Sequence, residues 1–549
     1  MKINILIGGK AGQGANAAAI LLGEILTEYG YYVFNYRDYP SLIRGGNNFN
    51  IVAVSNRKIK SHDKKVQLIV ALDENTIKEH KTGVNKNTPV ISIKDVYMDD
   101  KFKKVSNVFI LGLLLKFLDL PLDLLIKKLE EIFKGKKFLP LDKEAAESGY
   151  NADMKKLKLT KSEINRLDIR AKLRKPAHKN LRLLSGSDAI AKGAIKSGID
   201  IYLAYPMTPA TPVLHLLAGR QEKDNITVFL AENEIAVANA ALGSSHTGAR
   251  TMVGTSGGGY DLMTEAMSMQ GISEIPLVVY LAQRPGPGSG VPTYTGQGDL
   301  NIALNASHGE FPRVVIAPGD VEESIKCTNE AFYFAEKYRA LSILLGDKHV
   351  SESQFTYEKE PKLIKVKRNI DLKKVNGLYK NYDFTKNGNS KRSVPSVNIV
   401  KSTSYEHDEK GITIEDANMA KKMYDKRLRK EETMKKEVKK FQTYKIHGRK
   451  TSKNLIVGWG STKGAIIDAI HDMDAKFLQL IYIKPFPKEV RKYLENAKKV
   501  ILVENNATGL LSQEIRKETG FEIKDKILRY DGRPFEEDIL REEIKKKLI

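Results

Sequence analysis

The chain has 549 residues, of which 41% are hydrophobic, which is enough for about three or four domains with cores of their own. Its net charge of +23 comes without a helix-turn-helix, zinc-finger or aromatic RNA-binding pattern, so we expect a solvated basic surface or a docking face for an acidic protein, and no nucleic-acid binding. A single cysteine, Cys327, excludes disulfides and cysteine-ligated metal or iron–sulfur sites within the chain, and the lack of a long apolar run or a signal peptide predicts a cytoplasmic protein without a membrane span.

Residues 1–150 predict an α/β domain that begins with a strand, a glycine-rich turn and a helix. The strand covers residues 3–7, and the turn is Gly8-Gly-Lys-Ala-Gly-Gln-Gly14. The helix that follows points these apolar residues inward: Ala18, Leu21, Leu22, Ile25 and Leu26. Such a turn presents backbone N–H groups and a helix N-terminus to an anion. The spacing fits neither the dinucleotide fingerprint nor the Walker loop, so a tight turn without a ligand remains equally open.

The rest of this domain continues the α/β pattern. Its predicted elements are strands at residues 31–36, 49–54, 67–72 and 89–93, a further segment of the pattern at 108–115, and one helix over 119–140. Arg37, Arg44, Gly45 and Gly46 either line a polar interface near the glycine-rich turn or have a purely structural role. Residues 151–182 are charged and poorly periodic, which predicts an interdomain linker.

Residues 183–350 predict a second domain in which short apolar strands alternate with helices. The predicted strands are 199–204, 226–230, 250–255, 275–282, 313–317 and 342–345, and the predicted helices are 185–197, 213–221, 232–243, 260–270 and 321–337. This alternation predicts a doubly wound α/β fold. The turn Tyr205-Pro-Met-Thr-Pro-Ala-Thr-Pro212 holds Thr208 stiffly at the end of a strand, because three prolines restrict its backbone.

A loop at residues 284–300 carries five glycines and three prolines directly after a buried strand. Arg284 offers bidentate donors for a carboxylate or a phosphate. Thr293, Thr295, Gln297 and Asp299 add polar groups. Because α/β sheets bind ligands at the ends of their strands, this segment is interpreted as a substrate loop, with an ordinary surface loop as the alternative.

The helix predicted at residues 232–243 has an acidic first turn and a face made almost entirely of alanine and glycine. Glu232 and Glu234 either complement the helix dipole or serve a ligand. The small side chains imply close packing against another surface. Ser256-Gly-Gly-Gly259 opens the next helix and is a second place where backbone N–H groups could hold an anion.

Residues 351–450 are rich in lysine and predict a connecting segment that is partly ordered by packing, with one helix at 417–440. Residues 451–549 predict a third α/β domain. Its expected strands are 454–460, 477–483 and 499–503, with a helix to 472 capped by Ser461 and Thr462, and a motif Glu504-Asn-Asn-Ala-Thr-Gly509 that enters another helix.

Three blocks of the second domain resemble the α subunit of 2-oxoacid:ferredoxin oxidoreductases. They are Tyr205-Pro-Met-Thr-Pro209, the stretch from Glu234 to Gly259, and Arg284-Pro-Gly-Pro with Gly290-Val-Pro-Thr293. The glycine-rich turn, with Tyr39-Pro-Ser41 and Ile43-Arg-Gly-Gly46, resembles the γ subunit of that family, fused here ahead of α. The motif at 504–509 is similar to a transketolase C-terminal-like domain. The resemblance implies several doubly wound α/β domains: a γ-type domain, a pyrimidine-binding domain and the transketolase-like domain.

The resemblance also implies a thiamine diphosphate enzyme. It gives Glu234 the role of the carboxylate that hydrogen-bonds the aminopyrimidine ring, with Tyr205, Pro206 and Thr208 also in the cofactor site. It further implies that the 2-oxoacid or coenzyme A is bound by these residues: Thr208, Arg284, Thr293, Gly12 and Gly14. The reaction implied converts a 2-oxoacid, coenzyme A and oxidised ferredoxin into acyl-CoA, CO2 and reduced ferredoxin.

The chain lacks a Gly-Asp-Gly motif followed by a distant asparagine, and its one cysteine cannot hold a cluster. A β subunit would therefore supply the Mg2+–diphosphate site and the 4Fe-4S cluster, in an αβ or α2β2 complex, and no metal site is expected in this chain. Where many family members carry a basic residue after Pro-Thr293, this chain has Tyr294, which leaves 2-oxoglutarate, pyruvate and branched-chain oxoacids open. Two other interpretations are a thiamine-dependent decarboxylase or transferase subunit without ferredoxin, and a non-catalytic scaffold.

Overall fold

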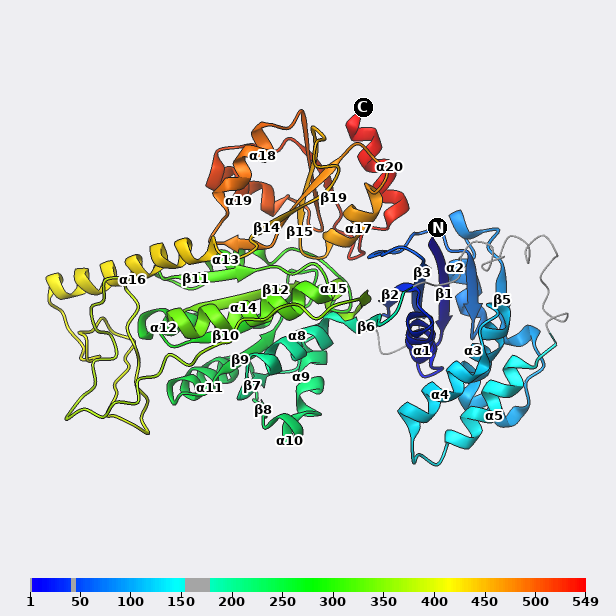
Figure 1. Ribbon diagram of the computed structural model, residues 1–549, viewed down its shortest axis with the longest axis horizontal. Helices are drawn as coiled ribbons and strands as arrows, with labels where there is room; N and C mark the ends of the chain where they lie inside the picture. Colours follow the sequence, from blue (N-terminus) through cyan, green and yellow to red (C-terminus); the bar gives the residue numbers. More distant parts are fainter. Residues whose placement is uncertain (1, 41–45, 154–177) are drawn as a thin grey trace. The chain divides into compact units, whose positions relative to one another are not determined.

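The computed structural model describes residues 2–40, 46–153 and 178–549. Arg44, Gly45 and most of the predicted linker lie outside the described residues. The chain forms two compact units, whose elements are labelled in Figure 1. Neither unit is continuous in sequence: the first takes residues 1–185, 352–359 and 535–543, and the second takes 186–351, 360–534 and 544–549.

The first unit contains a mixed seven-stranded sheet in the order β5-β4-β1-β3-β2-β13-β6. Its strands are β1 (Lys2–Gly9), β2 (Tyr32–Asp38), β3 (Asn48–Ser55), β4 (Leu68–Ala71), β5 (Val90–Ser92), β6 (Arg182–Ser185) and β13 (Gln354–Tyr357). β1, β4 and β5 run parallel, and the remaining pairs are antiparallel. The five strands predicted from the N-terminal residues are confirmed. β6 and β13 were not predicted, because four-residue strands carry almost no periodic signal.

Helices and three short 3-10 turns complete the first unit. They are α1 (Ala15–Glu28), α2 (Glu74–His80), α3 (Ser106–Phe117), α4 (Leu122–Phe133) and α5 (Leu139–Tyr150), with 3-10 turns at Gly83–Asn85, Ile93–Asp95 and Asp100–Val105. α1 buries the predicted apolar residues against β1, β2 and β3. The single helix predicted over 119–140 is wrong. The chain breaks at Gly135, which has φ 77°, and restarts with Pro140 in the first turn of α5, where a proline is tolerated.

The second unit contains a seven-stranded sheet in the order β17-β11-β12-β10-β9-β7-β8. Its strands are β7 (Ile201–Ala204), β8 (Thr227–Leu230), β9 (Thr251–Thr255), β10 (Leu277–Gln283), β11 (Arg313–Ile316), β12 (Leu341–Asp347) and β17 (Tyr482–Lys484). All pairs are parallel except β11 with β17. Its helices are α8 (Gly186–Lys196), α9 (Thr211–Ala218), α10 (Gln221–Asp224), α11 (Glu234–His246), α12 (Gly257–Ser273), α13 (Leu300–Asn305), α14 (Val321–Tyr338) and α15 (Lys348–Glu352). The predicted doubly wound α/β pattern is confirmed.

A five-stranded sheet near the C-terminus belongs to the same unit, in the order β14-β16-β15-β18-β19. Its strands are β14 (Tyr444–Gly448), β15 (Asn454–Trp459), β16 (Lys476–Leu480), β18 (Lys499–Glu504) and β19 (Asp525–Leu528). The helices around it are α17 (Thr462–Ala469), α18 (Arg491–Glu495), α19 (Leu510–Thr519) and α20 (Glu537–Leu548), with a 3-10 turn at Lys488–Val490. The first residues of α20 belong to the other unit. The strand predicted at 477–483 is in fact two, because the chain leaves β16 at Ile481 and continues as β17 in the other sheet. Ser461 makes no side-chain cap to α17, contrary to expectation.

The two sheets of the second unit share one hydrophobic core, in which Val279 and Ile343 from the first sheet are clustered with Val457 and Leu478 from the second. An ion-pair network reinforces this junction. The Lys463 ammonium lies 2.6 Å from Asp320 and 2.6 Å from Glu323, and all three side chains are buried. The C-terminal sheet is therefore fixed on the residues that follow β10 and β11, and this matters for the loop that carries Arg284.

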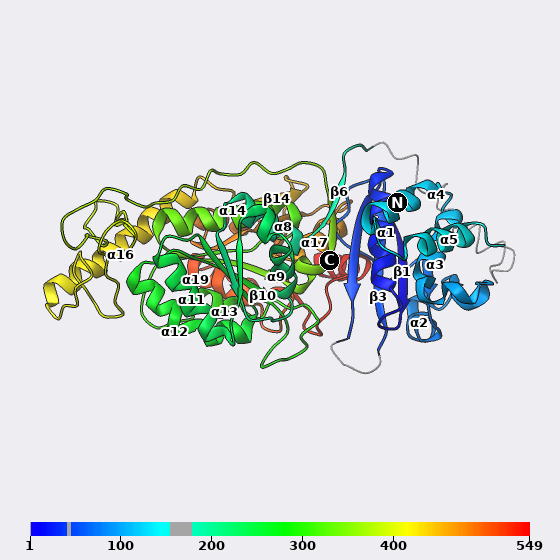
Figure 2. The ribbon, with the colours of Figure 1, turned by 90° about the horizontal axis from the view of Figure 1, so that it is seen from below.

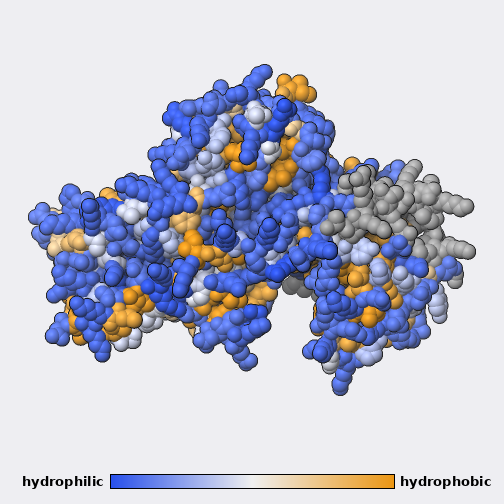
Figure 3. All heavy atoms as spheres, viewed as in Figure 1, coloured by the Kyte–Doolittle hydropathy of each residue, from blue (hydrophilic) through white to orange (hydrophobic). Residues whose placement is uncertain are grey.

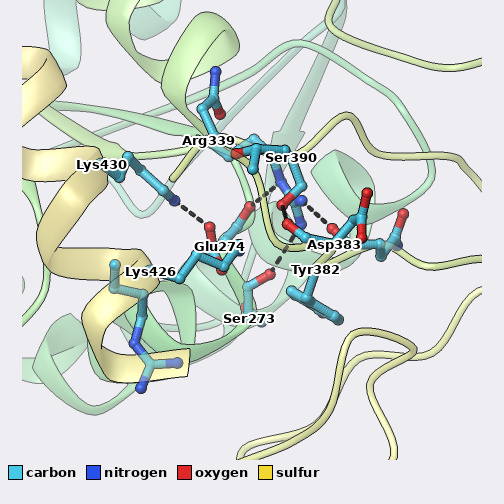
Figure 4. A network of polar contacts seen from close by, with 12 residues as sticks. Ser273, Glu274, Arg339, Tyr382, Asp383, Ser390, Lys426 and Lys430 are labelled. Carbon is cyan, nitrogen blue, oxygen red and sulfur yellow. Dashed lines mark hydrogen bonds and ion pairs between the residues drawn. The ribbon is translucent and has the colours of Figure 1, made fainter. Parts of the chain in front are cut away.

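The segment between β13 and β14 contains one long helix, α16 (Ala417–Val438), as predicted. Residues 360–416 form no helix or strand beyond isolated bridges, yet the buried Arg339 holds them by donating a hydrogen bond to Asn381 O. Figure 4 shows the main contact of α16: its Lys426 and Lys430 both bind the carboxylate of Glu274, with the Lys426 pair at 2.5 Å. The backbone carbonyl of Glu274 accepts a 2.9 Å hydrogen bond from Nε of Arg339. All four side chains are at most about 2% exposed, so one carboxylate faces three buried cations.

We expect Glu274→Gln to lower the free energy of unfolding by about 3–5 kcal/mol, because it leaves two buried ammonium groups without their anion. Lys430→Met is the matched variant, since it preserves the Glu274–Lys426 pair and should cost less than half as much. Thermal unfolding of both proteins measures the difference. Equal losses would show that Glu274 does not organise the cluster.

The same residues predict a pH dependence. Burial lowers the pKa of Lys430 to about 7, with Glu274 opposing the shift and Lys426 adding to it, whereas an unfolded lysine titrates near pH 10.4. Between these values the unfolded state binds more protons, so the stability of the wild type should rise with pH from 7 to 10. Lys430→Met should lose this contribution.

Candidate functional site

Three neighbouring parallel strands of the second unit end at one edge of the sheet. β7, β9 and β10 pair side by side, so the residues that follow them lie close together: Tyr205 after β7, Ser256 after β9 and Arg284 after β10. This edge, at the carboxyl ends of the strands, is where open α/β sheets bind ligands.

Glu234 is the first residue of α11 and only 3% of its surface is exposed. The helix begins there, and not at Glu232 as predicted, because the side chain of Asn233 caps it by accepting a 2.9 Å hydrogen bond from the Ala236 N–H. Glu232 stays outside the helix and is exposed. The position of Glu234 suits the positive end of the helix dipole, but dipole complementarity does not require a carboxylate to be buried.

The start of α12 packs directly against two carboxylates. A Cβ on Gly259 would lie 2.6 Å from Glu234 Oε1, and one on Gly257 would lie 2.6 Å from Asp299 Oδ2. Only glycine leaves room for both groups. The side chain of Ser256, the residue before the helix, makes no capping hydrogen bond. Two acidic side chains thus flank a helix N-terminus whose first N–H groups lack a side-chain cap.

Three buried polar atoms at this helix start, and a fourth on the loop at 284–300, have no hydrogen-bond partner among the described residues. They are Glu234 Oε1, Ser256 Oγ, Thr293 Oγ1 and Asp299 Oδ2. Leaving a buried polar atom unpaired costs roughly 1–3 kcal/mol, so proteins rarely retain several together without a reason. The cluster is the strongest indication of a ligand site in the second unit, and we call these four atoms the unpaired cluster.

Arg284 and Thr208, both predicted to be site residues, are in contact. Nη1 of Arg284 donates a 2.9 Å hydrogen bond to the main-chain oxygen of Thr208, which ties the loop after β10 to the turn after β7. Partial burial lowers the pKa of the Arg284 guanidinium, and the negative charges of Asp299 and Glu234 oppose this effect. Arg284 thus lies in the electrostatic field of the two carboxylates beside α12, while Tyr205 and Pro206 are exposed next to Thr208.

The remaining polar residues of the loop are divided between a structural role and the site. Thr293 is 7% exposed and its hydroxyl belongs to the unpaired cluster. Thr295 accepts a 3.2 Å hydrogen bond from the His349 N–H, and Gln297 is fully buried. Their place in the predicted substrate loop suggested that Thr295 and Gln297 face a substrate. Their contacts show instead that they fix the loop to its neighbours.

Gln297 is bound by the C-terminal sheet through both its side chain and its backbone. Its Nε2 donates to Trp459 O at 3.0 Å, and its Oε1 accepts from the Asn505 N–H at 2.8 Å. Its backbone N–H donates to Asn505 O at 2.7 Å, and its carbonyl accepts from Asn506 Nδ2 at 3.0 Å. Asn505 and Asn506 belong to the motif singled out at 504–509, which thus anchors the loop that carries Arg284.

Tyr294 occupies the position where a basic residue was expected. The guanidinium of Arg533 lies 3.6 Å from the centroid of its ring, in a cation–π contact. The neighbouring Gly532 carbonyl accepts a 3.0 Å hydrogen bond from the Thr295 N–H. A cation is therefore present beside the loop, but it comes from a residue 239 positions later in the chain, which sequence inspection could not have connected with Tyr294.

The glycine-rich turn lies in the first unit and is described separately. Gly12 and Gly14 have φ of 89° and 79°, values that a glycine adopts without strain. The side chain of Gln13 folds back to accept a 2.7 Å hydrogen bond from the Lys10 N–H. Asn107 packs against Gly14, where a Cβ would lie 2.6 Å from its Nδ2. The geometry is that of a tight turn entering a helix.

Two predicted residues near this turn have structural contacts. Arg37 stacks on Tyr39, with the guanidinium carbon 4.4 Å from the ring centroid, and Gly46 has φ 89° beside Pro40. Across the ranges that the structure describes, no group of three histidine, cysteine or acidic side chains is arranged to hold a metal ion. Nor is any helix of these ranges long and apolar enough to cross a bilayer.

The sequence motifs pointed to Glu234, Arg284 and Thr208. At Ser256 only the backbone N–H groups were considered, so no role was predicted for its side chain. Asp299 was given no role of its own. Asp299 directly precedes α13 and therefore has the appearance of a helix cap. Only the fold shows that its carboxylate turns instead towards Gly257. No local signal could have revealed this.

Comparisons with known proteins point to one family. Residues 192–426 match the family model of the pyruvate flavodoxin/ferredoxin oxidoreductase thiamine diphosphate-binding domain, and residues 4–152 match that of pyruvate ferredoxin/flavodoxin oxidoreductase. A 2-oxoacid:ferredoxin oxidoreductase α subunit from Sulfolobus sp. is 30% identical over 100% of this chain and 97% of its own length. A 2-oxoglutarate synthase subunit from Archaeoglobus fulgidus is 38% identical over 32% of this chain and 51% of its own.

Among solved structures, a 2-oxoglutarate:ferredoxin oxidoreductase from Magnetococcus marinus is similar over the whole chain. The TM-score is 0.86 and the identity 25%, with 100% of both chains covered. That structure contains 2-oxoglutarate, coenzyme A and succinyl-CoA. The similarity therefore extends to the order and packing of all the α/β layers, and not only to the sequence motifs.

We expect Gln297→Ala to lower the free energy of unfolding by about 1–3 kcal/mol, because it leaves the Asn505 N–H buried without its partner and removes one of the two side-chain hydrogen bonds to Trp459 O, the other coming from Thr462. Hydrogen exchange should also increase across residues 284–299. The control is Gln513→Ala, since Gln513 is exposed and its loss should change stability by less than about 0.5 kcal/mol. Unchanged exchange in the loop would contradict the anchoring role of Gln297.

Proposed function

Because the chain belongs to the family of 2-oxoacid:ferredoxin oxidoreductase α subunits, we propose that it contributes Glu234 and the loop at 284–300 to an active site that a β subunit completes. The reaction is the oxidative decarboxylation of a 2-oxoacid with coenzyme A to acyl-CoA and CO2, with ferredoxin as the electron acceptor. The single observation that supports this assignment most directly is the unpaired cluster, three of whose four atoms lie at the start of α12.

Glu234 fits the aminopyrimidine ring of thiamine diphosphate. Its Oε1 is buried and unpaired, and it therefore offers an acceptor for a ring N–H in a place without competing water. Asn233 fixes the position of the carboxylate by capping α11. Gly259 leaves room for the carboxylate beside α12. Thiamine diphosphate, when bound, supplies a nucleophilic carbon and an acceptor for the electrons left by decarboxylation.

Arg284 is suited to hold the carboxylate of the 2-oxoacid. One guanidinium N–H is used on Thr208 O, so the remaining N–H groups are available for a planar, bidentate contact. The Thr293 hydroxyl is a further donor on the same loop. These groups orient the substrate so that the bond to be cleaved faces the cofactor, and orientation of this kind supplies a large share of catalysis.

Coenzyme A is the second substrate, and we assign part of its binding to the glycine-rich turn with Gly12 and Gly14. The support is the exposed backbone of Gly12 at the entrance to α1, where N–H groups favour a phosphate. Tyr205 and Pro206 belong to the cofactor site, because they follow β7 immediately before Thr208.

The partner is a β subunit that binds next to Glu234. Apolar side chains are exposed around this residue: Tyr205 at 40%, Phe229 at 48%, Leu230 at 57%, Ile235 at 50% and Leu262 at 51%. α11 and α12 lie side by side (Figure 2), and α11 presents a face of small residues to which Gly243 belongs. On the face drawn in Figure 3 most residues are hydrophilic and hydrophobic side chains reach the surface in separate patches.

The β subunit must also bring the metal chemistry. Cys327, the one cysteine of the sequence, is buried and cannot ligate a cluster. A partner that supplies the Mg2+ ion, the diphosphate site and a 4Fe-4S cluster, in an αβ or α2β2 complex, would account for the electron transfer to ferredoxin.

We expect Glu234→Gln to reduce kcat by at least about 100-fold, because an amide cannot match the carboxylate as an acceptor for the ring N–H. The measurement is dye reduction that depends on the 2-oxoacid and coenzyme A, with the α and β subunits purified together. Glu232→Gln is the matched control, since Glu232 is exposed two residues earlier and its loss should leave the rate unchanged. A fully active Glu234→Gln complex would support a scaffold role instead.

We also expect Leu230→Lys and Leu262→Lys to weaken the binding of the β subunit by at least about tenfold, since each places a charge in an apolar contact. Analytical ultracentrifugation of the mixed subunits measures the affinity. Leu372→Lys is the control, because Leu372 is 71% exposed in the connecting segment, whose Ile370 packs at Gly248 beyond the end of α11 opposite Glu234. Equal weakening by all three variants would contradict the location of the interface.

A further inference from the structure

Asp299 does not behave like the helix cap that its position suggests. It precedes α13 but makes no side-chain cap to that helix. Its backbone N–H donates a 3.1 Å hydrogen bond to Gln283 Oε1, and Gln283 in turn donates through Nε2 to Gly346 O at 3.1 Å. Asp299 is therefore held beside the last residue of β10, directly next to Arg284, by a fully buried glutamine.

The carboxylate of Asp299 is directed at the start of α12. Both of its oxygens would lie within 2.7 Å of a Cβ placed on Gly257. Oδ2 is inaccessible to solvent and has no hydrogen-bond partner in the described chain. A side chain that is fixed, buried and unpaired has lost its hydration without compensation, and this is unfavourable unless another molecule provides the contact.

The charged groups that face Asp299 come from two elements. Asp261 on α12 is a like charge, and Arg284 after β10 is an opposite one. Burial raises the pKa of Asp299 to about 7, Asp261 adds to the rise and Arg284 opposes it. The carboxyl group therefore changes between a hydrogen-bond donor and an anion near neutral pH.

We propose that Asp299 is a further binding residue of the active site, and that its neutral carboxyl group donates a hydrogen bond to an oxygen of the 2-oxoacid held by Arg284. The proposal rests on the proposed function for the identity of the substrate. It explains why an acid that is desolvated and placed near a second acid is retained at this position. A neutral donor binds a substrate oxygen without the repulsion that an anion would exert on a carboxylate.

The first test is kinetic and uses the α and β subunits purified together. Asp299→Ala removes the donor, so kcat/KM for the 2-oxoacid should fall by about 100-fold. Asp299→Asn keeps an N–H donor without titration, so it should retain much more activity and lose the decline of kcat/KM above about pH 7 that the wild type should show. Asp261→Asn removes a like charge beside Asp299 and should therefore lower the pKa of the Asp299 carboxyl group. We expect the decline of kcat/KM to move to lower pH in this variant.

The second test is independent of activity. A carboxyl group whose pKa is raised by folding loses its stabilising effect as the pH rises through the folded value. The change in stability extends from the unfolded pKa of about 4 to the folded pKa of about 7, so the Tm of Asp299→Asn should exceed that of the wild type by more at pH 8.5 than at pH 5.5. Glu323→Gln is the matched control: Glu323 is also buried, but it is ion-paired with Lys463 at 2.6 Å, so its amide should lower the Tm at both pH values.

The proposal is overturned if Asp299→Ala is fully active, if Asp299→Asn keeps the alkaline decline, or if Asp299→Asn lowers the Tm at both pH values as Glu323→Gln does. A wild-type complex that oxidises no 2-oxoacid would instead refute the proposed function. In that case the Tm comparison still decides whether Asp299 is an unpaired buried acid.

Discussion

The N-terminus of α12 is the constraint on which the rest of the second unit depends. Two carboxylates, from Glu234 and Asp299, are buried against glycines at this helix start, and one oxygen of each has no hydrogen-bond partner within the described ranges. Folding removes them from water and leaves part of their hydrogen bonding unused, so the fold must be stabilised elsewhere. The site that we propose for a charged cofactor and an acidic substrate would use this arrangement, because groups that are unpaired in the protein can pair with a ligand.

The stabilisation comes from contacts that lie outside the site. Lys463 with Asp320 and Glu323 joins the C-terminal sheet to the parallel sheet, and the four hydrogen bonds of Gln297 then hold the loop that carries Arg284. Glu274 with Lys426 and Lys430 attaches α16 to the end of α12 opposite the candidate site. One end of α12 is thus fixed by an ion-paired carboxylate, while the other end presents carboxyl oxygens without a hydrogen-bond partner in the described chain.

Much of this could be predicted from the sequence. The strand–helix alternation predicted the α/β layers, and the motifs at Tyr205, Glu234 and Arg284 identified the family, because each motif is local and its residue types are chemically restrictive. The same motifs supplied the residues of the candidate site, whose roles remain predictions. What could not be predicted depends on contacts between distant residues. The role of Gln297 requires Asn505, the cation over Tyr294 comes from Arg533, and β13 joins a sheet more than 300 positions earlier in the chain.

The errors have the same origin. The prediction of a single helix over 119–140 was wrong because the chain breaks at Gly135 and starts a new helix with Pro140 in its first turn. Both residues are local signals of a helix boundary, but the continuous apolar spacing outweighed them in the prediction. The strand at 477–483 failed because its two halves belong to different sheets, which no local pattern encodes. Asp299 is the instructive case, because its sequence context favours a helix cap and its tertiary context prevents one. Where a residue departs from the structural role that its local sequence favours, and is left buried without a partner, a ligand is the simplest physical reason for keeping it.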